Sequence, residues 1–286
     1  MMMGKYFLKL VVMAMLVCCQ SSDDDNAFPI ENLPANNWDR DVNNPVLESV
    51  DTLTNISDPT VIYQGKFQMW AGCVGTDVTF ASICYSESTD GINWSDPIVV
   101  FTPSTAAEGW DNQKTEIPTV IYDEDEADVT KRYKMWYGGA NRENRDLIKI
   151  GYAYSEDGIN WNRLPACLSL DQQAGLVLVP GFEVGDAGVV SDPTSVIKNG
   201  TYHIWYNSFG ANNDIMISHA TSSNGYEWIK DTSNPVMIPE VNWEDQGPGD
   251  ITKDVSHPVV LVDNNDGIIS CGLDLSMTVT LKPTVV

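Results

Sequence analysis

The sequence predicts an all-β protein of the β-propeller class, built from a short four-stranded unit that repeats along the chain. Nearly the same seven-residue stretch occurs three times, as STDGINW at 88–94, SEDGINW at 155–161 and SSNGYEW at 222–228, and its tryptophans lie 67 residues apart. Short segments rich in Val, Ile, Tyr and Trp precede each copy, as expected of strands. Four short strands that repeat at roughly 60 to 75 residues are typical of propeller blades rather than of a sandwich.

Three segments precede the turn in every copy, and each is bounded by Gly, Asn or Asp as strands usually are. In the second copy they read EIPTVIY (116–122), RYKMWYGG (132–139) and KIGYAYS (149–155). The first copy reads SDPTVIY (57–63), KFQMWAG (66–72) and SICYSES (82–88), and the third reads SDPTSVI (191–197), TYHIWYN (201–207) and IMISHATS (215–222). The segment NPVMI at 234–238 predicts a fourth strand after the turn.

The repeated turn has a structural explanation. Its Asp-Gly or Asn-Gly pair supplies the positive φ that a tight hairpin needs, and its Ser can bond backbone groups inside the turn. The tryptophan of each turn can fill the space between adjacent blades. Another tryptophan recurs in the second strand of each copy, at Trp70, Trp136 and Trp205, and this regularity indicates core packing. We therefore expect none of the turns to be catalytic.

The beginning of the chain reads as a leader rather than as part of the fold. Two lysines precede an apolar run over residues 10–17, which is the layout of a secretory signal and too short to span a bilayer. The following LVCC resembles a bacterial lipoprotein box, which implies a signal peptide over 1–18 and a lipid on Cys19, with Cys18 as the alternative. A plain signal peptide with incidental cysteines is the other interpretation.

Residues 19–36 form an acidic flexible tether in this interpretation. The stretch SSDDD at 21–25 resembles the acidic segment that sends some Gram-negative lipoproteins to the cell surface. The resemblance implies a protein attached by its lipid to the outer membrane and exposed at the surface, with the periplasmic face as the alternative. The lipid anchor is then the only expected contact with a membrane.

The propeller is expected over residues 37–267, and its first segment belongs to an incomplete blade. Trp38 precedes NPVL at 44–47 by the interval at which Trp228 precedes NPVM at 234–237. A turn tryptophan and an outer strand before the first full blade indicate that the chain start completes the last blade. That arrangement would remove an exposed sheet edge.

The end of the chain departs from the repeat. SHPVVLV at 256–262 opens another blade, but IISCGLDLSM follows where a Y-x-M-W strand is due near 269–273. If residues 267–272 were encoded GGT-ATT-ATA-AGT-TGT-GGN, the frame that starts at the third base would read Tyr-Tyr-Lys-Leu-Trp, which is the missing strand. We therefore hypothesise that residues 268–286 are an anomalous, out-of-frame tail, which leaves about three full blades and parts of two.

Charge and cysteine content limit the partners. None of the 40 acids precedes Cys19, whereas two of the 16 bases do, so the processed chain has 14 bases, 40 acids and a net charge of −26. Such a surface repels phosphate backbones, which excludes nucleic acid as a partner. The cysteines after the leader show no metal-ligand spacing. Cys73 and Cys84 flank a hairpin and can pair in an oxidising compartment, although we expect two half-buried thiols.

Candidate chemistry lies at the first strand of each blade, because these strands line the central channel of a propeller. Asp58 in SDP, Glu116 in EIP, Asp192 in SDP and His257 in SHP would project into one funnel. Like charges raise each other's pKa, and glycoside hydrolysis uses this effect: one carboxyl stays protonated as general acid while another is base or nucleophile. A structural role, in which the aspartates bond backbone amides at the strand start, is the alternative.

The repeated YKMWYGG…IGYAYSEDGINW, with SDPT and NPV, resembles the five-bladed propeller superfamily of glycoside hydrolases that includes families 32, 43, 62, 68, 117 and 130. The resemblance covers residues 38 to about 267. It implies that Asp58 is the base or nucleophile, that Asp192 tunes a pKa or binds sugar hydroxyls, and that Glu116 is the acid. The glutamate comes in an earlier blade than is usual, and the fourth copy carries His257 with Asp254 nearby.

Further substrate-binding candidates lie in loops. Trp110 and Asp111 can stack on a sugar ring and hold its hydroxyls, with packing between blades as the alternative. Arg142 and Arg145, in NRENRD, can reach a uronate or other acidic sugar, with a solvated hairpin tip as the alternative. The segment WED at 243–245 is a similar loop candidate. His257 can bind sugar, a channel water or a cation, although one histidine is no metal motif.

The sequence therefore predicts a monomeric, lipid-anchored glycoside hydrolase that acts on a plant or host oligosaccharide or polysaccharide. Carboxylates carry this mechanism, so we expect no organic cofactor and no metal; a channel cation such as calcium has no motif in its favour. The first alternative is a non-catalytic glycan-binding lipoprotein that captures oligosaccharide for a transporter. The second is a phosphorylase like those of family 130, which would need basic residues at the channel to hold phosphate.

Overall fold

The computed structural model describes residues 44–47, 53–75, 80–181, 188–209, 214–239, 255–262 and 268–270. Several predictions concern other residues, and these lie outside the described part: the leader and tether over 1–36, Trp38, the loop at 243–245, Asp254 and the tail from 271 onward. In the part that the structure describes, no helix is long and apolar enough to cross a membrane.

Regular structure in the described residues is nearly all antiparallel β, as the sequence predicts, apart from three short 3₁₀ turns at 129–131, 166–168 and 170–172. The strands of the first sheet are β1 (Leu53–Tyr63), β2 (Phe67–Gly75), β3 (Ala81–Ser88) and β4 (Ile98–Phe101). The second has β5 (Lys114–Tyr122), β6 (Tyr133–Ala140), β7 (Lys149–Ser155), β8 (Trp161–Arg163) and β9 (Leu176–Leu178), which pairs with β7. The third has β10 (Val190–Lys198), β11 (Thr201–Phe209), β12 (Ile215–Ser222) and β13 (Ile229–Lys230).

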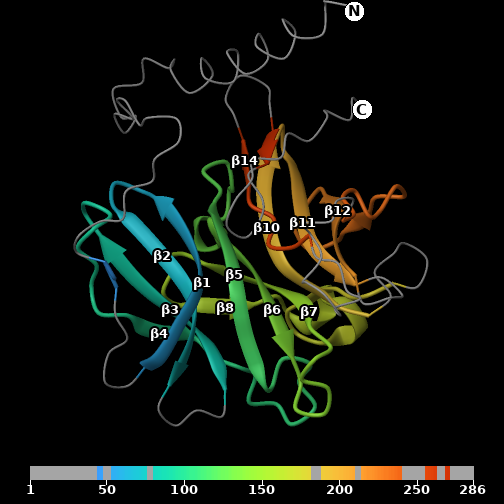
Figure 1. Cartoon of the computed structure of the whole chain (residues 1–286), viewed down its shortest axis with the longest axis horizontal. Coiled ribbons are helices and arrows are strands. Elements are labelled where there is room, and N and C mark those ends of the chain that lie inside the picture. Colours follow the sequence, from blue (N-terminus) through green and yellow to red (C-terminus); the bar gives the residue numbers. More distant parts are fainter. Residues whose placement is uncertain are drawn as a thin grey trace, which may run out of the picture. The chain divides into compact units, whose positions relative to one another are not determined.

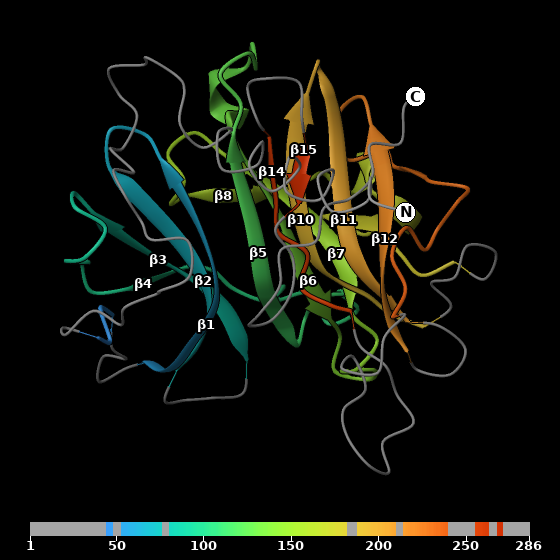
Figure 2. The ribbon, with the colours of Figure 1, turned by 45° about the horizontal axis from the view of Figure 1, so that its top comes forward.

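Each of these sheets is a propeller blade in which the first four strands are hydrogen-bonded in the order of the sequence, and Figure 1 shows the three blades. The first strands of successive blades are neighbours: β1 contacts β5, and β5 contacts β10. A fourth blade begins with β14 (Val260–Val262), which contacts β10 and pairs with β15 (Ile268–Ser270), as Figure 2 shows. The first strands therefore line one region, where the predicted channel residues lie.

Two details differ from the predicted strands. The fourth strand of the third blade is β13, and the predicted strand at 234–238 makes only an isolated bridge between Met237 and Ile217. Residues 268–270, the first of the predicted out-of-frame tail, pair with β14 where a second strand was due. The reading frame itself remains a prediction.

The repeated turns join adjacent blades. In the second copy Ser155 Oγ accepts a hydrogen bond from Gly158 N at 2.9 Å, and Asp157 Oδ1 accepts one from Asn160 N at 2.7 Å. The indole of Trp70, in the preceding blade, donates to Gly158 O at 2.7 Å. The next blade repeats this contact, because Trp136 Nε1 donates to Gly225 O at 2.7 Å. The turns thus have the structural role that the sequence predicts.

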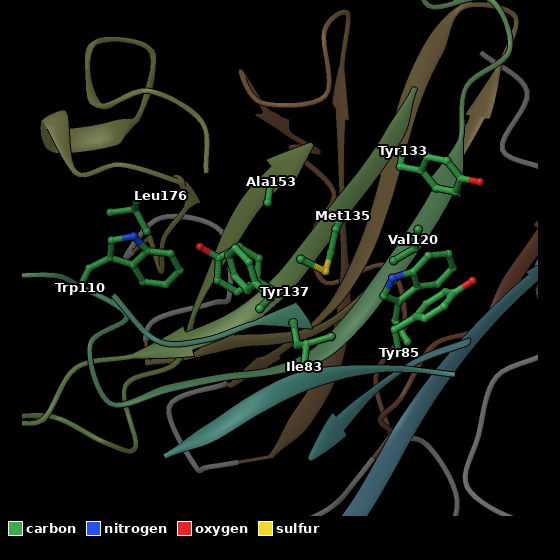
Figure 3. Packing of buried hydrophobic residues seen from close by; sticks show 11 residues of the cluster. Ile83, Tyr85, Trp110, Val120, Tyr133, Met135, Tyr137, Ala153 and Leu176 are labelled. Atoms are coloured by element: carbon green, nitrogen blue, oxygen red, sulfur yellow. The ribbon is translucent and has the colours of Figure 1, made fainter. Parts of the chain in front are cut away.

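The core consists of layers between blades. Ile83 and Tyr85 of the first blade pack against Val120, Met135 and Tyr137 of the second (Figure 3). A second cluster joins the second and third blades, and a smaller one joins the third blade to residues 255 and 260 of the fourth. Each blade therefore buries its apolar faces against its neighbours.

The expectation of two thiols at Cys73 and Cys84 is wrong, because these residues form a disulfide with a Cα–Cα distance of 5.9 Å. Cys73 lies opposite Ser82 in the β2–β3 ladder, so Cys84 is its diagonal neighbour on the same face. The sulfur atoms can therefore meet without distortion of the strands. Cys167 is a free, exposed cysteine.

Candidate active site

The residue before the first-strand proline has a left-handed backbone in each of the four copies that the structure describes. The φ values are 52° for Asp58, 52° for Ile117, 50° for Asp192 and 55° for His257. In the three complete blades the strand register shifts at this point. Left-handed residues other than glycine are uncommon and concentrate at functional sites, and a bulge re-aims the side chain that it carries. The blades therefore present one side chain each at equivalent positions.

The second blade departs from this pattern, because Ile117 rather than an acid occupies the left-handed position. Glu116 is one residue earlier, in the place of the serines of the SDP motifs, and lies opposite Gly138 in the β5–β6 ladder. Its Oε1 forms an ion pair with Lys114 Nζ at 2.6 Å, and both side chains are about four-fifths buried. The structure therefore places the Glu116 carboxyl against Lys114, a partner that the sequence analysis did not consider.

Asp192 is the centre of a hydrogen-bonded cluster. Its Oδ2 accepts hydrogen bonds from Ser191 Oγ at 2.5 Å and from Asn207 Nδ2 at 2.9 Å. Its Oδ1 lies 3.2 Å from His257 Nε2. Asn207 Oδ1 in turn accepts a hydrogen bond from His257 N at 3.0 Å, and His257 Nδ1 lies 3.0 Å from Ser256 Oγ. Residues of the third and fourth blades thus fix the Asp192 carboxyl on both oxygens.

The electrostatics connect Asp192 to the first blade. Burial raises the pKa of Asp192, the hydrogen bond from Ser191 and the charge of His257 lower it, and the negative charge of Asp58 raises it. Asp58 itself is exposed, whereas Asp192 is 8% exposed. His257 therefore contacts Asp192, and Asp58 acts on Asp192 through its charge, with one carboxyl open to solvent and one held in place.

Trp110 and Asp111 do not have the substrate-binding role expected of them, because both are buried, at 3% and 1% exposure. Trp110 and Tyr137 are neighbours in Figure 3, and their stacked rings have centroids 5.7 Å apart. The indole of Trp110 donates to Ala174 O. Asp111 Oδ2 accepts hydrogen bonds from Tyr137 at 3.0 Å and from Arg163 Nε at 2.9 Å. Packing against the second blade, rather than substrate binding, therefore accounts for both residues.

Arg142 is exposed beside a pocket of about 420 Å³. Its guanidinium lies 4.9 Å from the centroid of the Phe80 ring. The other side chains that line the pocket include Ser82, Ser104, Thr105 and Asn112. Gly75, at its edge, pairs with Leu53, so the pocket lies at the end of the first blade where β1 begins. Arg145 is exposed and does not line this pocket.

A metal centre built from three or more side chains is not found in the part of the chain that the structure describes: no such group of His, Cys, Asp or Glu could hold an ion there. His257, for which the sequence offers a sugar, a channel water or a cation as the ligand, directs its Nε2 at Asp192 and its Nδ1 at Ser256. Sequence reasoning missed Asn207 and Lys114. The sequence could have indicated Asn207, because this residue is an asparagine where the equivalent positions of the other two blades, 72 and 138, are glycine.

Comparison with known proteins yields structural neighbours only. No family model matches the sequence, and no curated protein matches it. A family 117 glycoside hydrolase produced by the marine bacterium Zobellia galactanivorans is similar with a TM-score of 0.56 and 14% identity, over 79% of this chain and 64% of that one. An N-acetylgalactosamine deacetylase from F. plautii, in complex with blood group B trisaccharide, has a TM-score of 0.57 and 14% identity, over 79% and 66%.

The beta-1,2-mannobiose phosphorylase from Listeria innocua has a TM-score of 0.56 and 15% identity, over 75% of this chain and 54% of that one. The chain thus covers less than two thirds of each of these three structures. Their names describe three different reactions on carbohydrates, and a fold alone does not select among reactions. The protein has the β-propeller fold that these carbohydrate-active enzymes share.

Proposed function

We propose that this protein hydrolyses glycosidic bonds in a plant or host oligosaccharide or polysaccharide, with Asp58 as base or nucleophile. The observation that carries the proposal is the pair of left-handed bulges that present Asp58 and Asp192, together with the effect of the Asp58 charge on the pKa of Asp192. Two interacting carboxylates in unequal environments are the chemical requirement of glycoside hydrolysis. The propeller fold shared with carbohydrate-active enzymes supports the same conclusion.

The environments assign different roles to the two aspartates. Asp58 is exposed, so its oxygens are available to a water molecule or to the anomeric carbon of a sugar. Asp192 is engaged by Ser191, Asn207 and His257, which restrict its rotation. We assign Asp192 to tuning the charge at the site and to accepting a sugar hydroxyl, and His257 to positioning Asp192.

The general acid of this proposal is Glu116. A general acid must donate a proton to the leaving oxygen, whereas the Glu116 carboxyl is engaged in the ion pair with Lys114. Glu116 can therefore act as the acid only if bound sugar displaces Lys114 from its carboxyl. The pocket beside Arg142 is the proposed subsite for a sugar that carries a carboxylate, since guanidinium binds carboxylate in a planar, bidentate geometry.

A non-catalytic glycan-binding protein is the second candidate, and two observations favour it. Ile117 occupies the position that holds an aspartate in the first and third blades, and Lys114 neutralises Glu116. In this alternative the polar groups around Asp192 hold sugar hydroxyls and Asp58 has no chemical role. A phosphorylase is a third candidate, for which Lys114 and Arg142 would be the phosphate-binding cations.

One experiment separates these candidates. The protein, Asp58→Asn, Glu116→Gln and the control Asp96→Asn, an exposed aspartate on the blade rim, are assayed on nitrophenyl glycosides and plant polysaccharides with and without inorganic phosphate. Hydrolysis is expected, with a loss of about 10²-fold or more in Asp58→Asn and Glu116→Gln and none in Asp96→Asn. Saturable binding without turnover, unchanged in Asp58→Asn, would establish the glycan-binding protein instead. Turnover that depends on phosphate would establish the phosphorylase.

We further propose that the protein is lipid-anchored through Cys19, or Cys18, to the outer membrane and faces outward. The disulfide between Cys73 and Cys84 supports a location outside the cytosol, because disulfides persist in oxidising compartments. Cys19→Ser should move the protein from the detergent-rich to the aqueous phase in a Triton X-114 partition. Retention in the detergent phase by Cys19→Ser but not by Cys18→Ser would assign the lipid to Cys18.

A further inference from the structure

The residue opposite the serine of the SDP motif differs between the first and third blades. Ser57 pairs with Gly72 in the β1–β2 ladder, whereas Ser191 pairs with Asn207 in the β10–β11 ladder. Both motifs carry a left-handed aspartate, with a φ of 52° or 50°. We propose that this position on the second strand decides whether the aspartate of the motif is held in place, by the amide of Asn207, or left free to move to a ligand, over Gly72.

Asn207 holds the third-blade carboxyl through its side-chain amide. The amide nitrogen donates to Asp192 Oδ2 at 2.9 Å, and the amide oxygen accepts from His257 N at 3.0 Å. Asn207 is 3% exposed, and burial strengthens both hydrogen bonds. The side chain therefore joins the left-handed residue of the third blade to that of the fourth.

The serine of the motif bonds its aspartate in the third blade but not in the first. Ser191 Oγ donates to Asp192 Oδ2 at 2.5 Å, so this oxygen accepts two hydrogen bonds. In the part of the chain that the structure describes, Asp58 has no side-chain hydrogen bond, although Ser57 precedes it, and it is exposed. The motif and its backbone are alike in the two blades, so the difference arises from the side chains around each carboxyl. Of the neighbours outside the motif, the amide of Asn207 is the buried one.

Neither the backbone nor the packing requires glycine at position 72. Gly72 does not have a left-handed backbone. A Cβ there would lie 3.4 Å from Ser57 Oγ and 3.8 Å from Ile117 N, which are ordinary contacts. At the equivalent Gly138, a Cβ would lie 3.3 Å from Ile148 Cγ2, which is tighter. Position 72 can therefore accept a side chain.

An amide at position 72 would meet the same kind of partner as Asn207 does. Ile117 N is equivalent to His257 N, because each belongs to the left-handed residue of the following blade. A side-chain amide oxygen lies roughly 2.4 Å from its Cβ, and a hydrogen bond to it is about 2.9 Å long. Together these lengths exceed the 3.8 Å between the Cβ position and Ile117 N, so the oxygen can reach this nitrogen. The amide nitrogen should then donate to Asp58, as in the third blade.

The consequence for catalysis rests on the proposed function. A base or nucleophile must bring an oxygen to a water molecule or to an anomeric carbon, whereas a carboxyl that tunes the charge of the site must stay in place. Gly72 leaves Asp58 able to make that approach, and Asn207 prevents it for Asp192. The second strand, rather than the SDP motif itself, thus assigns the two roles.

NMR of the full chain without a ligand tests the positioning role. Gly72→Asn should move the backbone amide proton of Ile117 downfield, because this proton gains a hydrogen bond. Gly72→Ala is the matched control, since it adds the Cβ without the amide and should cause a much smaller shift. Asn207→Gly should raise the pKa of Asp192, because the hydrogen bond from Asn207 lowers it. Equal Ile117 shifts in the two position-72 variants, or an unchanged pKa of Asp192 in Asn207→Gly, would overturn the inference.

The unchanged protein supplies a measurement for the case in which a variant fails to fold. The side-chain ¹⁵N resonance of Asn207 should follow the titration of the Asp192 carboxyl, because the two groups share a hydrogen bond. A resonance that does not move while Asp192 titrates would contradict the positioning role.

Hydrolysis of nitrophenyl glycosides tests the consequence for catalysis. Gly72→Asn should lower kcat by about tenfold or more, because a reacting group held away from its target loses much of its effect. Gly72→Ala should retain most of the activity, and equal activity in the two variants would contradict the role of the glycine. If the unchanged protein hydrolyses no glycoside while the NMR results are as expected, the proposed function is wrong and the positioning role of Asn207 stands.

Discussion

His257 Nε2 lies 3.2 Å from Asp192 Oδ1 and joins the opening strand segment of the fourth blade to the first strand of the third. The contact places an imidazole beside a carboxyl whose pKa burial raises. Asp58 acts on the same carboxyl in the opposite direction to His257. The effect of each neighbour should therefore be measurable as a change in the pKa of Asp192, without any assay of activity.

Asp58→Asn should lower the pKa of Asp192, because it removes the negative charge that raises it. His257→Gln should raise the pKa of Asp192, because it removes the positive charge that lowers it. The measurement is a ¹³C NMR titration of the Asp192 carboxyl in each variant, with Asp96→Asn as the control that should leave it unchanged. If the pKa of Asp192 moved in the same direction in both variants, the opposite effects of Asp58 and His257 on this carboxyl would be contradicted.

Gly158→Ala should destabilise the protein much more than Gly200→Ala. Both glycines have a φ of 75°, so alanine has the same backbone strain of roughly 1–2 kcal/mol at either position. A Cβ at Gly158 would lie 2.7 Å from Trp70 Cζ2, whereas nothing lies within 4 Å of one at Gly200. Urea unfolding of both variants measures the difference, which reports the packing between the first and second blades. Equal losses of unfolding free energy in the two variants would show that the turn at Gly158 does not pack tightly against Trp70.

Arg163→Met should cost roughly 3–5 kcal/mol of unfolding free energy at neutral pH, because it leaves the buried charge of Asp111 without its cation. Burial already raises the pKa of Asp111 and Arg163 lowers it, so the variant should have a still higher pKa there. The loss of unfolding free energy in Arg163→Met should therefore become smaller as the pH falls and Asp111 becomes protonated. Chemical unfolding from pH 4 to 8 checks the trend. The double variant Asp111→Asn with Arg163→Met should lack that pH dependence.

Reduction of the Cys73–Cys84 disulfide should lower the unfolding free energy by about 2–3 kcal/mol, since it opens a loop of 11 residues. The native protein should react with a thiol reagent at the exposed Cys167, and at Cys73 and Cys84 only after a reductant is added. Peptide mass spectrometry of the labelled protein locates the reacted thiols. Labelling of Cys73 without a reductant would contradict the disulfide.

The sequence predicted the blades well because a strand of five to nine residues and a Gly-containing turn are local features. KIGYAYS and IMISHATS coincide with β7 and β12 at both ends. The site was harder to predict, because a bulge decides which residue of a three-residue motif turns toward the channel. Counting back from the proline, rather than looking for an acid, would have placed Ile117 beside Asp58 and Asp192 and Glu116 one position away.

Burial was the other property that the sequence could not supply. Trp110 and Asp111 precede a first strand and resemble a loop pair, yet they pack beneath Tyr137 and Arg163 from two other strands. The contact of Asn207 with Asp192 depends likewise on the register between β10 and β11. Such contacts join residues tens of positions apart or depend on a one-residue choice of register, and no local pattern encodes either.

The tryptophan-to-glycine hydrogen bonds couple each of the first two blades to the blade that follows it. Trp70 joins the first blade to the second, and Trp136 joins the second to the third, so the second blade is held from both sides. Where each unit contacts only its neighbours, the first blade, which has this bond on one side in the described residues, should open before the second. Amide hydrogens of β6 and β7 should accordingly exchange last, and the first strands around Asp58 and Asp192 should open separately from one another.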